Sequence, residues 1–173
     1  MFPLRFPVAV VIERVPLANR WASEQWRVAT AERDDSGPAP PVKLSNDATG
    51  TRWRFVGHSI ELHRSESEGY FLNITAPEPK IFVMWRMIDS EDQTVGGPGA
   101  RPHLVTVSYN EAARLLDGGE RIDVVPLASE ILAWMQPFVA EHYRPEPKRK
   151  VRRNELYERD AKERDAPSGS HHD

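Results

Sequence analysis

Alternating apolar and polar positions run through the first two thirds of the chain and predict β-strands. The clearest run covers residues 7–14, where Val8, Val10 and Ile12 fall on one face. Similar runs, rich in β-branched and aromatic residues, predict further strands at 25–33, 53–64, 70–75, 81–88 and 104–108. The run 81–88 is apolar on both faces, which predicts a central strand covered from both sides.

The segments between these runs are rich in turn-forming residues. The connections SESEG and APEPK are too short to bridge parallel strands, so we expect the strands that they join to pair antiparallel. Segments 34–50 and 89–102 combine proline with glycine and are predicted to be loops. Within the run 53–64, strict alternation would place four residues on one face: Val56, His58, Ile60 and Leu62.

Two helices are predicted near the end of the patterned region. Ser108 and Glu111 have the spacing of a capping box, and the apolar positions that follow stop at Gly118. A second helical pattern covers about 127–142, and Pro137 is expected to kink it or restart it.

Together these elements predict an α+β fold. We expect an antiparallel sheet or partial barrel of about six strands, followed by two C-terminal helices, with 121–126 as a short extended piece between the helices. The folded unit is predicted to be a single domain over residues 1–143. Residues 144–173 are charged and poor in large apolar side chains, so this tail is predicted to be largely disordered.

Composition narrows the class of protein. The 173 residues fit one domain, and the absence of cysteine excludes disulfides, thiolate metal sites and cysteine nucleophiles. The net charge of −3 divides unevenly, because 144–173 holds nine Lys and Arg against seven Asp and Glu. No apolar run approaches the length of a membrane span or a secretory signal, so we expect a cytoplasmic protein without a membrane partner.

Motifs for metal, nucleophilic or nucleotide chemistry are weak. His58 and His63 are separated by an odd number of residues on one predicted strand, so they point to opposite faces and no metal site is predicted. The glycine-rich segment 96–102 lacks the lysine and hydroxyl residue of a phosphate-binding loop. No catalytic residues and no cofactor are predicted from these patterns.

The distinctive feature of the sequence is that four of its five tryptophans adjoin an arginine. A strand face lined by arginines could bind carboxylate or phosphate groups, whereas the simpler interpretation places the tryptophans in the core and pairs the arginines with acids. The candidate partner- or anion-binding residues of the predicted sheet are Trp53, Arg54, Trp85, Arg86 and Arg27. The tail adds the basic residues Lys148, Arg149, Lys150, Arg152 and Arg153.

The basic run also raises the possibility of nucleic-acid binding. The remainder of the chain is acidic, no aromatic RNA-binding motif is present, and the acidic segment 154–173 would compete for the same bases. The sequence therefore favours a protein or a small anion over nucleic acid as the partner.

Four segments carry a family resemblance: PVAVVIERVPLANRWASEQWRV (7–28), GYFLNITAPEPKIFVMWRM (69–87), VTVSYNEAARLLDGGERIDVVPL (105–127) and HYRPEPKRKVRRN (142–154). In these segments the chain resembles the bacterial domain-of-unknown-function family 3305. The resemblance implies a role beside formate dehydrogenase and other molybdenum enzymes, and some such proteins carry the label molybdopterin-guanine dinucleotide biosynthesis protein A. It implies no catalytic residues.

That label does not fit the residues as a description of activity. A guanylyltransferase of this type needs a glycine-rich loop after its first strand, whereas the first glycine of this chain is Gly37. The leading hypothesis is a non-enzymatic accessory or assembly protein for a molybdenum-dependent oxidoreductase, and formate dehydrogenase is the first candidate for that enzyme. Its partners would be an enzyme subunit or maturation factors, and a molybdopterin-type ligand could reach it through that partner. The alternative is a small-ligand binder, or an enzyme acting on an anionic metabolite or pterin-type cofactor.

Overall fold

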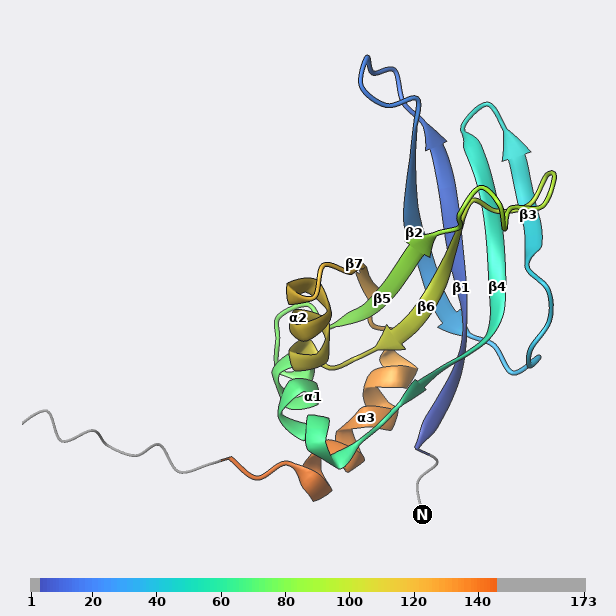
Figure 1. The fold of residues 1–173 in the computed structure, drawn as a ribbon. Helices are drawn as coiled ribbons and strands as arrows, with labels where there is room; N and C mark the ends of the chain where they lie inside the picture. The colour runs from blue at the N-terminus through green and yellow to red at the C-terminus, as the bar shows by residue number, and fades with distance from the viewer. Residues whose placement is uncertain (1–3, 146–173) are drawn as a thin grey trace, which may run out of the picture.

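The computed structural model describes residues 4–145 and shows strands and helices interleaved along the chain (Figure 1). The strands are β1 (Arg5–Pro16), β2 (Glu24–Arg33), β3 (Val42–Asp47), β4 (Gly50–Glu61), β5 (Lys80–Met87), β6 (Ala100–Thr106) and β7 (Arg121–Pro126). The helices are a short 3-10 turn (Arg64–Glu66), α1 (Ser67–Ile74), α2 (Tyr109–Asp117) and α3 (Ser129–His142).

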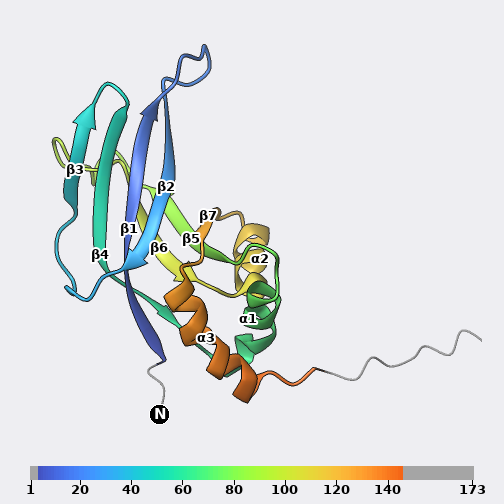
Figure 2. The same cartoon turned by 180° about the vertical axis from the view of Figure 1, so that it is seen from behind.

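The strands form two antiparallel sheets. The four-stranded sheet has the order β2-β1-β4-β3, and the three-stranded sheet has the order β6-β5-β7. The helices gather beside the three-stranded sheet, away from β3 (Figure 2). The α+β class and the antiparallel character of the sheets are therefore confirmed. The pairs predicted across SESEG and APEPK are wrong, because α1 lies between the two connections and β4 and β5 belong to different sheets. Strands and helices do not segregate along the chain as predicted, because α1 lies between β4 and β5.

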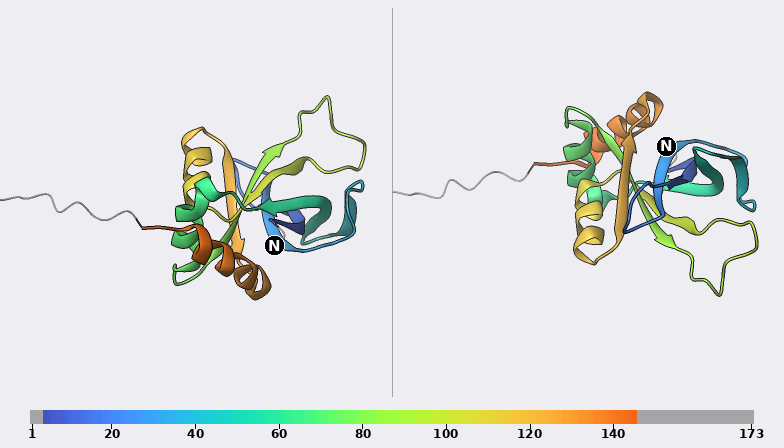
Figure 3. Two further views of the ribbon diagram at one scale, coloured as in Figure 1. Left: turned by 90° about the horizontal axis from the view of Figure 1, so that it is seen from below. Right: turned by 90° about the horizontal axis from the view of Figure 1, so that it is seen from above.

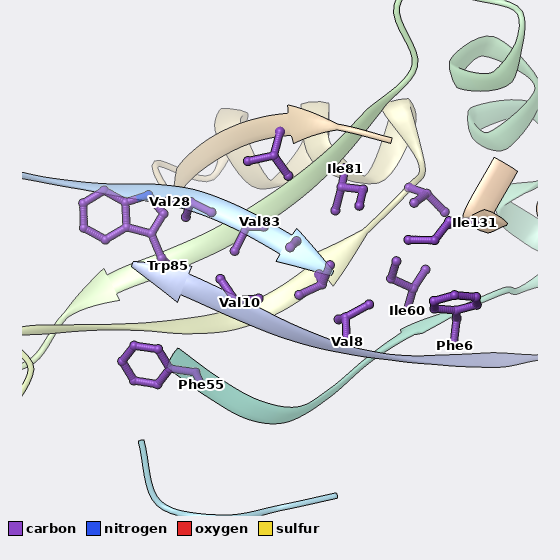
Figure 4. Close-up of a cluster of buried hydrophobic side chains, with 14 of the residues drawn as sticks. Phe6, Val8, Val10, Val28, Phe55, Ile60, Ile81, Val83, Trp85 and Ile131 are labelled. Atoms are coloured by element: carbon purple, nitrogen blue, oxygen red, sulfur yellow. The ribbon is translucent and has the colours of Figure 1, made fainter. Parts of the chain in front are cut away.

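The core lies where the two sheets meet each other and α3 (Figure 4). Val8, Val10 and Ile12 of β1 are fully buried, as their alternation predicts. The central position of β5 is also confirmed, since Ile81 to Trp85 are all buried. Side chains of both sheets point toward one another in this cluster, so each sheet covers the inner face of the other.

The predicted strand at 70–75 is wrong, because residues 70–74 belong to helix α1 and Thr75 caps its C-terminal end. Its interior face is set by Tyr70 and Asn73, which are three residues apart and both buried. The Asn73 side chain donates to the carbonyls of Lys80 (2.7 Å) and Val107 (2.9 Å) and accepts from the amide of Lys80 (2.9 Å). A short apolar run fits either period, and these tertiary hydrogen bonds favour the helix.

The predicted loop 34–50 is only partly a loop, because it contains β3. Asp47 makes the turn that returns the chain into β4, where its carboxylate accepts the Thr49 amide at 2.8 Å. Pro137 also does not interrupt α3, which runs continuously from Ser129 to His142. Burial of Met135 and Phe138 on either side of Pro137 holds the helix together.

A bulge in β4 decides which of its side chains face the core. Val8 pairs with His58 but Val10 pairs with Phe55, so β4 carries one extra residue opposite β1. Gly57 occupies this bulge with φ +82°, and a Cβ there would lie 2.8 Å from the Cα of Pro38. The single face predicted for 56–62 is therefore wrong: Trp53 and Phe55 are buried before the bulge, and Ile60 and Leu62 after it.

We predict that Gly57→Ala lowers the free energy of unfolding by about 2 kcal/mol or more, because alanine adds backbone strain and a clash with Pro38. Gly37→Ala is the matched control, since Gly37 has φ +79° but no heavy atom within 4 Å of an added Cβ. Only the backbone strain, about 1 kcal/mol, is expected there. Urea denaturation followed by circular dichroism measures both, and equal losses would contradict a structural role for the approach to Pro38.

Candidate functional site

A cleft of about 850 Å³ lies between the β3–β4 hairpin and the long connection from β5 to β6. Figure 1 shows this connection passing beside β4 and β3, and Figure 3 shows it projecting from the rim of the molecule. One wall is formed by residues 39–43 and β4, and the other by parts of 88–103. Its volume lies within the range that binds small organic molecules.

The floor of the cleft is apolar. Trp53, Phe55, Val56 and Ile88 line it, and Phe55 and Val56 both do so because the backbone turns at the Gly57 bulge. The Trp53 ring is only 6% exposed, and Trp26 stacks against it at 5.4 Å between ring centroids. The Gly99 position keeps that stack compact, since a Cβ there would lie 2.8 Å from the Trp26 ring.

Two cations at the mouth of the cleft are not neutralised by the domain itself. Lys43 and Arg101 both line the cleft, and neither forms an ion pair with a carboxylate of residues 4–145. The Lys43 ammonium lies 5.7 Å from the centroid of the Trp53 ring, a cation–π distance. Asp92 on the opposite wall is the acidic residue of the lining.

Two histidines lie on adjoining elements of the same cleft. His58 belongs to β4 and His103 to β6, and these strands contact each other where the sheets join. Burial and the nearby His103 lower the pKa of His58. Burial also lowers the pKa of His103, as do Arg86 and Arg101, while Glu120 opposes them. Both rings are therefore biased toward the neutral form in the free protein.

The arginines predicted from the sequence as binding residues form ion pairs within the domain. Arg54 pairs with Asp34, and Arg86 pairs with Glu120. Arg27 and Arg52 converge on the buried carboxylate of Glu13, with N–O distances of 2.5 and 2.9 Å. Burial alone would raise the pKa of Glu13, but the two guanidinium groups outweigh it and lower that pKa below its ordinary value.

The two predicted tryptophans are buried and lie in different hollows. Trp53 lines the cleft, whereas Trp85 and Arg27 line a second hollow of about 500 Å³, together with Trp26 and Arg121. The Arg121 guanidinium lies 5.3 Å from the centroid of the Trp85 ring. Within the described part of the chain, the buried indole N–H groups of Trp26 and Trp85 have no acceptor.

Five predicted binding residues of the tail lie outside the described residues: Lys148, Arg149, Lys150, Arg152 and Arg153. Most of the segment 144–173 that is predicted to be disordered also lies outside them. Sequence reasoning missed Lys43, Arg101 and His103, because they lie in or beside segments that were taken as loops. The signal that could have found them is the presence of lysine, arginine and histidine in two proline-rich segments, 38–43 and 98–103.

Between residues 4 and 145, no group of three His, Asp or Glu side chains is placed to hold a metal ion. In the same range, no helix is long and apolar enough to cross a membrane.

Fold and cleft together define the chain as a two-sheet α+β domain with a ligand-sized cleft at the junction of its sheets. Residues 7–152 match the family model described as "Protein of unknown function (DUF3305)", and the chain belongs to this family. No curated protein and no solved structure matches the chain.

We predict that Glu13→Gln lowers the free energy of unfolding by about 1–3 kcal/mol at neutral pH, because two guanidinium groups lose their shared buried carboxylate. The pKa of Glu13 is depressed in the folded protein, so its contribution is complete above the ordinary glutamate pKa and disappears as pH falls through the folded value. The difference between wild type and Glu13→Gln should therefore shrink in acid.

Glu61→Gln provides the control for this measurement, because the pair of Glu61 with Arg5 is exposed and should contribute less than about 1 kcal/mol. Denaturation of the three proteins across a pH series gives the comparison. A Glu13→Gln difference that is constant with pH would refute the assigned role.

Proposed function

We propose that this protein is a non-enzymatic binding protein that holds a small anionic molecule in the cleft and serves a molybdenum-dependent oxidoreductase, with formate dehydrogenase as the first candidate. The observation that carries the binding role is that two cationic side chains of the cleft, Lys43 and Arg101, have no carboxylate partner in the described region. The floor of the same cleft is apolar. A ligand anion would supply the missing charge.

The contrast with the other arginines supports this role. Arg27, Arg54 and Arg86 each have a carboxylate partner within the domain, so their charges are already satisfied. Charge-assisted hydrogen bonds to a ligand are strongest where a cation has no competing partner. Lys43 and Arg101 meet this condition in a concave site.

The accessory role rests on the resemblance to proteins associated with molybdenum enzymes. A protein partner would find exposed apolar side chains on β3, an edge strand of the four-stranded sheet, where Val42 and Leu44 are more than half exposed. Of the contact residues predicted from the sequence, Trp53 and Arg54 lie on β4, which pairs with β3, whereas Trp85 and Arg86 lie on β5. The tail bases belong to the same prediction. A cytoplasmic location belongs to this same proposal.

Two experiments in the native host test the two parts of the proposal. Native mass spectrometry of the purified protein should reveal a bound anionic molecule, such as a pterin-type compound, that is released unchanged. Deletion of the encoding gene should lower formate dehydrogenase activity or its cofactor content. Unchanged activity and unchanged cofactor content would overturn the accessory role, and release of a chemically altered ligand would favour an enzyme.

We predict that Arg101→Gln weakens binding of the recovered ligand by about tenfold, because one charge-assisted contact is lost. Lys43→Gln should have an effect of similar size. Arg20→Gln is the matched control, since Arg20 is exposed in the β1–β2 connection, outside the residues that line the cleft. Isothermal titration calorimetry measures the affinities, and equal affinity of Arg101→Gln and wild type would contradict the assignment of this cleft.

A further inference from the structure

The cleft contains more potential positive charge than it carries at neutral pH. Lys43 and Arg101 supply two cationic side chains, and His58 and His103 can each add a charge on protonation. All four side chains line one cavity, and they come from β3, β4 and β6. An anion bound there would face up to four cationic groups.

The charged and titratable groups around the two rings are few. His103 faces Arg101 on its own strand, Arg86 on the neighbouring β5, Glu120 after α2, and His58 on β4. His58 faces His103 and is set among the apolar groups of β4 and β1, where Val8 is its strand partner. Lys43 and Asp92 complete the charged lining.

Glu120 offsets the positive charge around His103 only in part, because it also pairs with Arg86. Its carboxylate is engaged by the Arg86 guanidinium, with one N–O distance of 3.0 Å, and this contact lowers the pKa of Glu120. Asp92 is the one acidic side chain among the described lining residues, and it lies on the β5–β6 connection. With both histidines neutral, Lys43 and Arg101 against Asp92 leave a single net positive charge in the lining. With both protonated, the lining carries three.

We propose that the cleft binds its anion together with protons, so that His58 and His103 become charged as the ligand enters and the site holds its ligand more tightly in mildly acidic solution. This inference rests on the proposed function, because it concerns the same cleft. It assigns to the two histidines the role of making ligand retention depend on pH.

The sign of the dependence follows from linkage. Neutral rings in the free protein and charged rings in the complex mean that the complex holds more protons, so affinity increases as pH falls. The ligand class follows from the shape of the cleft. An apolar floor of Trp53, Phe55 and Ile88 in about 850 Å³ fits a ring-sized body, and the cations fit a sulfonate, phosphate or carboxylate attached to it.

The test uses 2-naphthalenesulfonate, whose charge is constant across the pH range, with the full chain. Its affinity, measured by calorimetry, should increase by about tenfold between about pH 7.5 and about pH 5.5. Inorganic sulfate, which has the charge without the ring, and 2-naphthalenemethanol, which has the ring without the charge, should both bind far more weakly. Calorimetry in buffers of different ionisation enthalpy should show proton uptake on binding.

The variant His58→Gln/His103→Gln should lose the gain in acid, so that its own affinity for the sulfonate is about the same at the two pH values. His63→Gln is the matched control, because its side chain is exposed and it does not line the cleft. Circular dichroism confirms that the variants fold. Binding that does not vary with pH, or a pH dependence that survives in the double variant, overturns the proton linkage and leaves the proposed function standing. No sulfonate binding at any pH overturns both.

Discussion

The close approach of Gly57 to Pro38 is the constraint on which the cleft depends. The bulge at Gly57 adds one residue to β4, and the missing side chain lets the 34–41 segment lie against the strand. That contact directs Ala39, Pro40 and Pro41 into one wall of the cleft and brings Phe55 and Val56 into its floor. The same extra residue reverses the alternation of β4, so that Ile60 and Leu62 face the core beside α1 and α3.

The distribution of charge separates structural arginines from available ones. Glu13 joins Arg27 of β2 to Arg52 of β4 across β1, so this cluster ties three strands of the four-stranded sheet. Arg86 is held by Glu120 in a similar way. For three of the four tryptophans that adjoin an arginine, the indole ring lies in or against the core and the adjacent guanidinium group is paired with a carboxylate. Trp21 is the exception, because it is 90% exposed. The unpaired cations of the cleft, Lys43 and Arg101, do not adjoin a tryptophan in sequence.

Much of the fold could be predicted from the sequence where one local rule acted alone. The alternation of Val8, Val10 and Ile12 gave the buried face of β1, and the Ser108 cap is present, since the Ser108 hydroxyl accepts the Glu111 amide at 3.1 Å. Residues 70–75 could not be predicted in this way, because hydrogen bonds from Asn73 to β5 and to Val107 stabilise a helix there. The cleft could not be predicted either, since its two walls come from segments about 50 residues apart, and one wall is placed by the contact of Gly57 with Pro38.

The central claim is that an anionic ligand binds beside Trp53 and not elsewhere on the domain. The indole N–H signals of the five tryptophans in a nitrogen-15 NMR spectrum test this claim most directly when 2-naphthalenesulfonate is added. If the sulfonate binds in the cleft, we expect a large shift of the Trp53 signal and a smaller shift of the Trp26 signal, because the Trp26 ring stacks on Trp53. The signals of Trp21 and Trp134 should not change. A shift confined to Trp21 or Trp85 would contradict the claim.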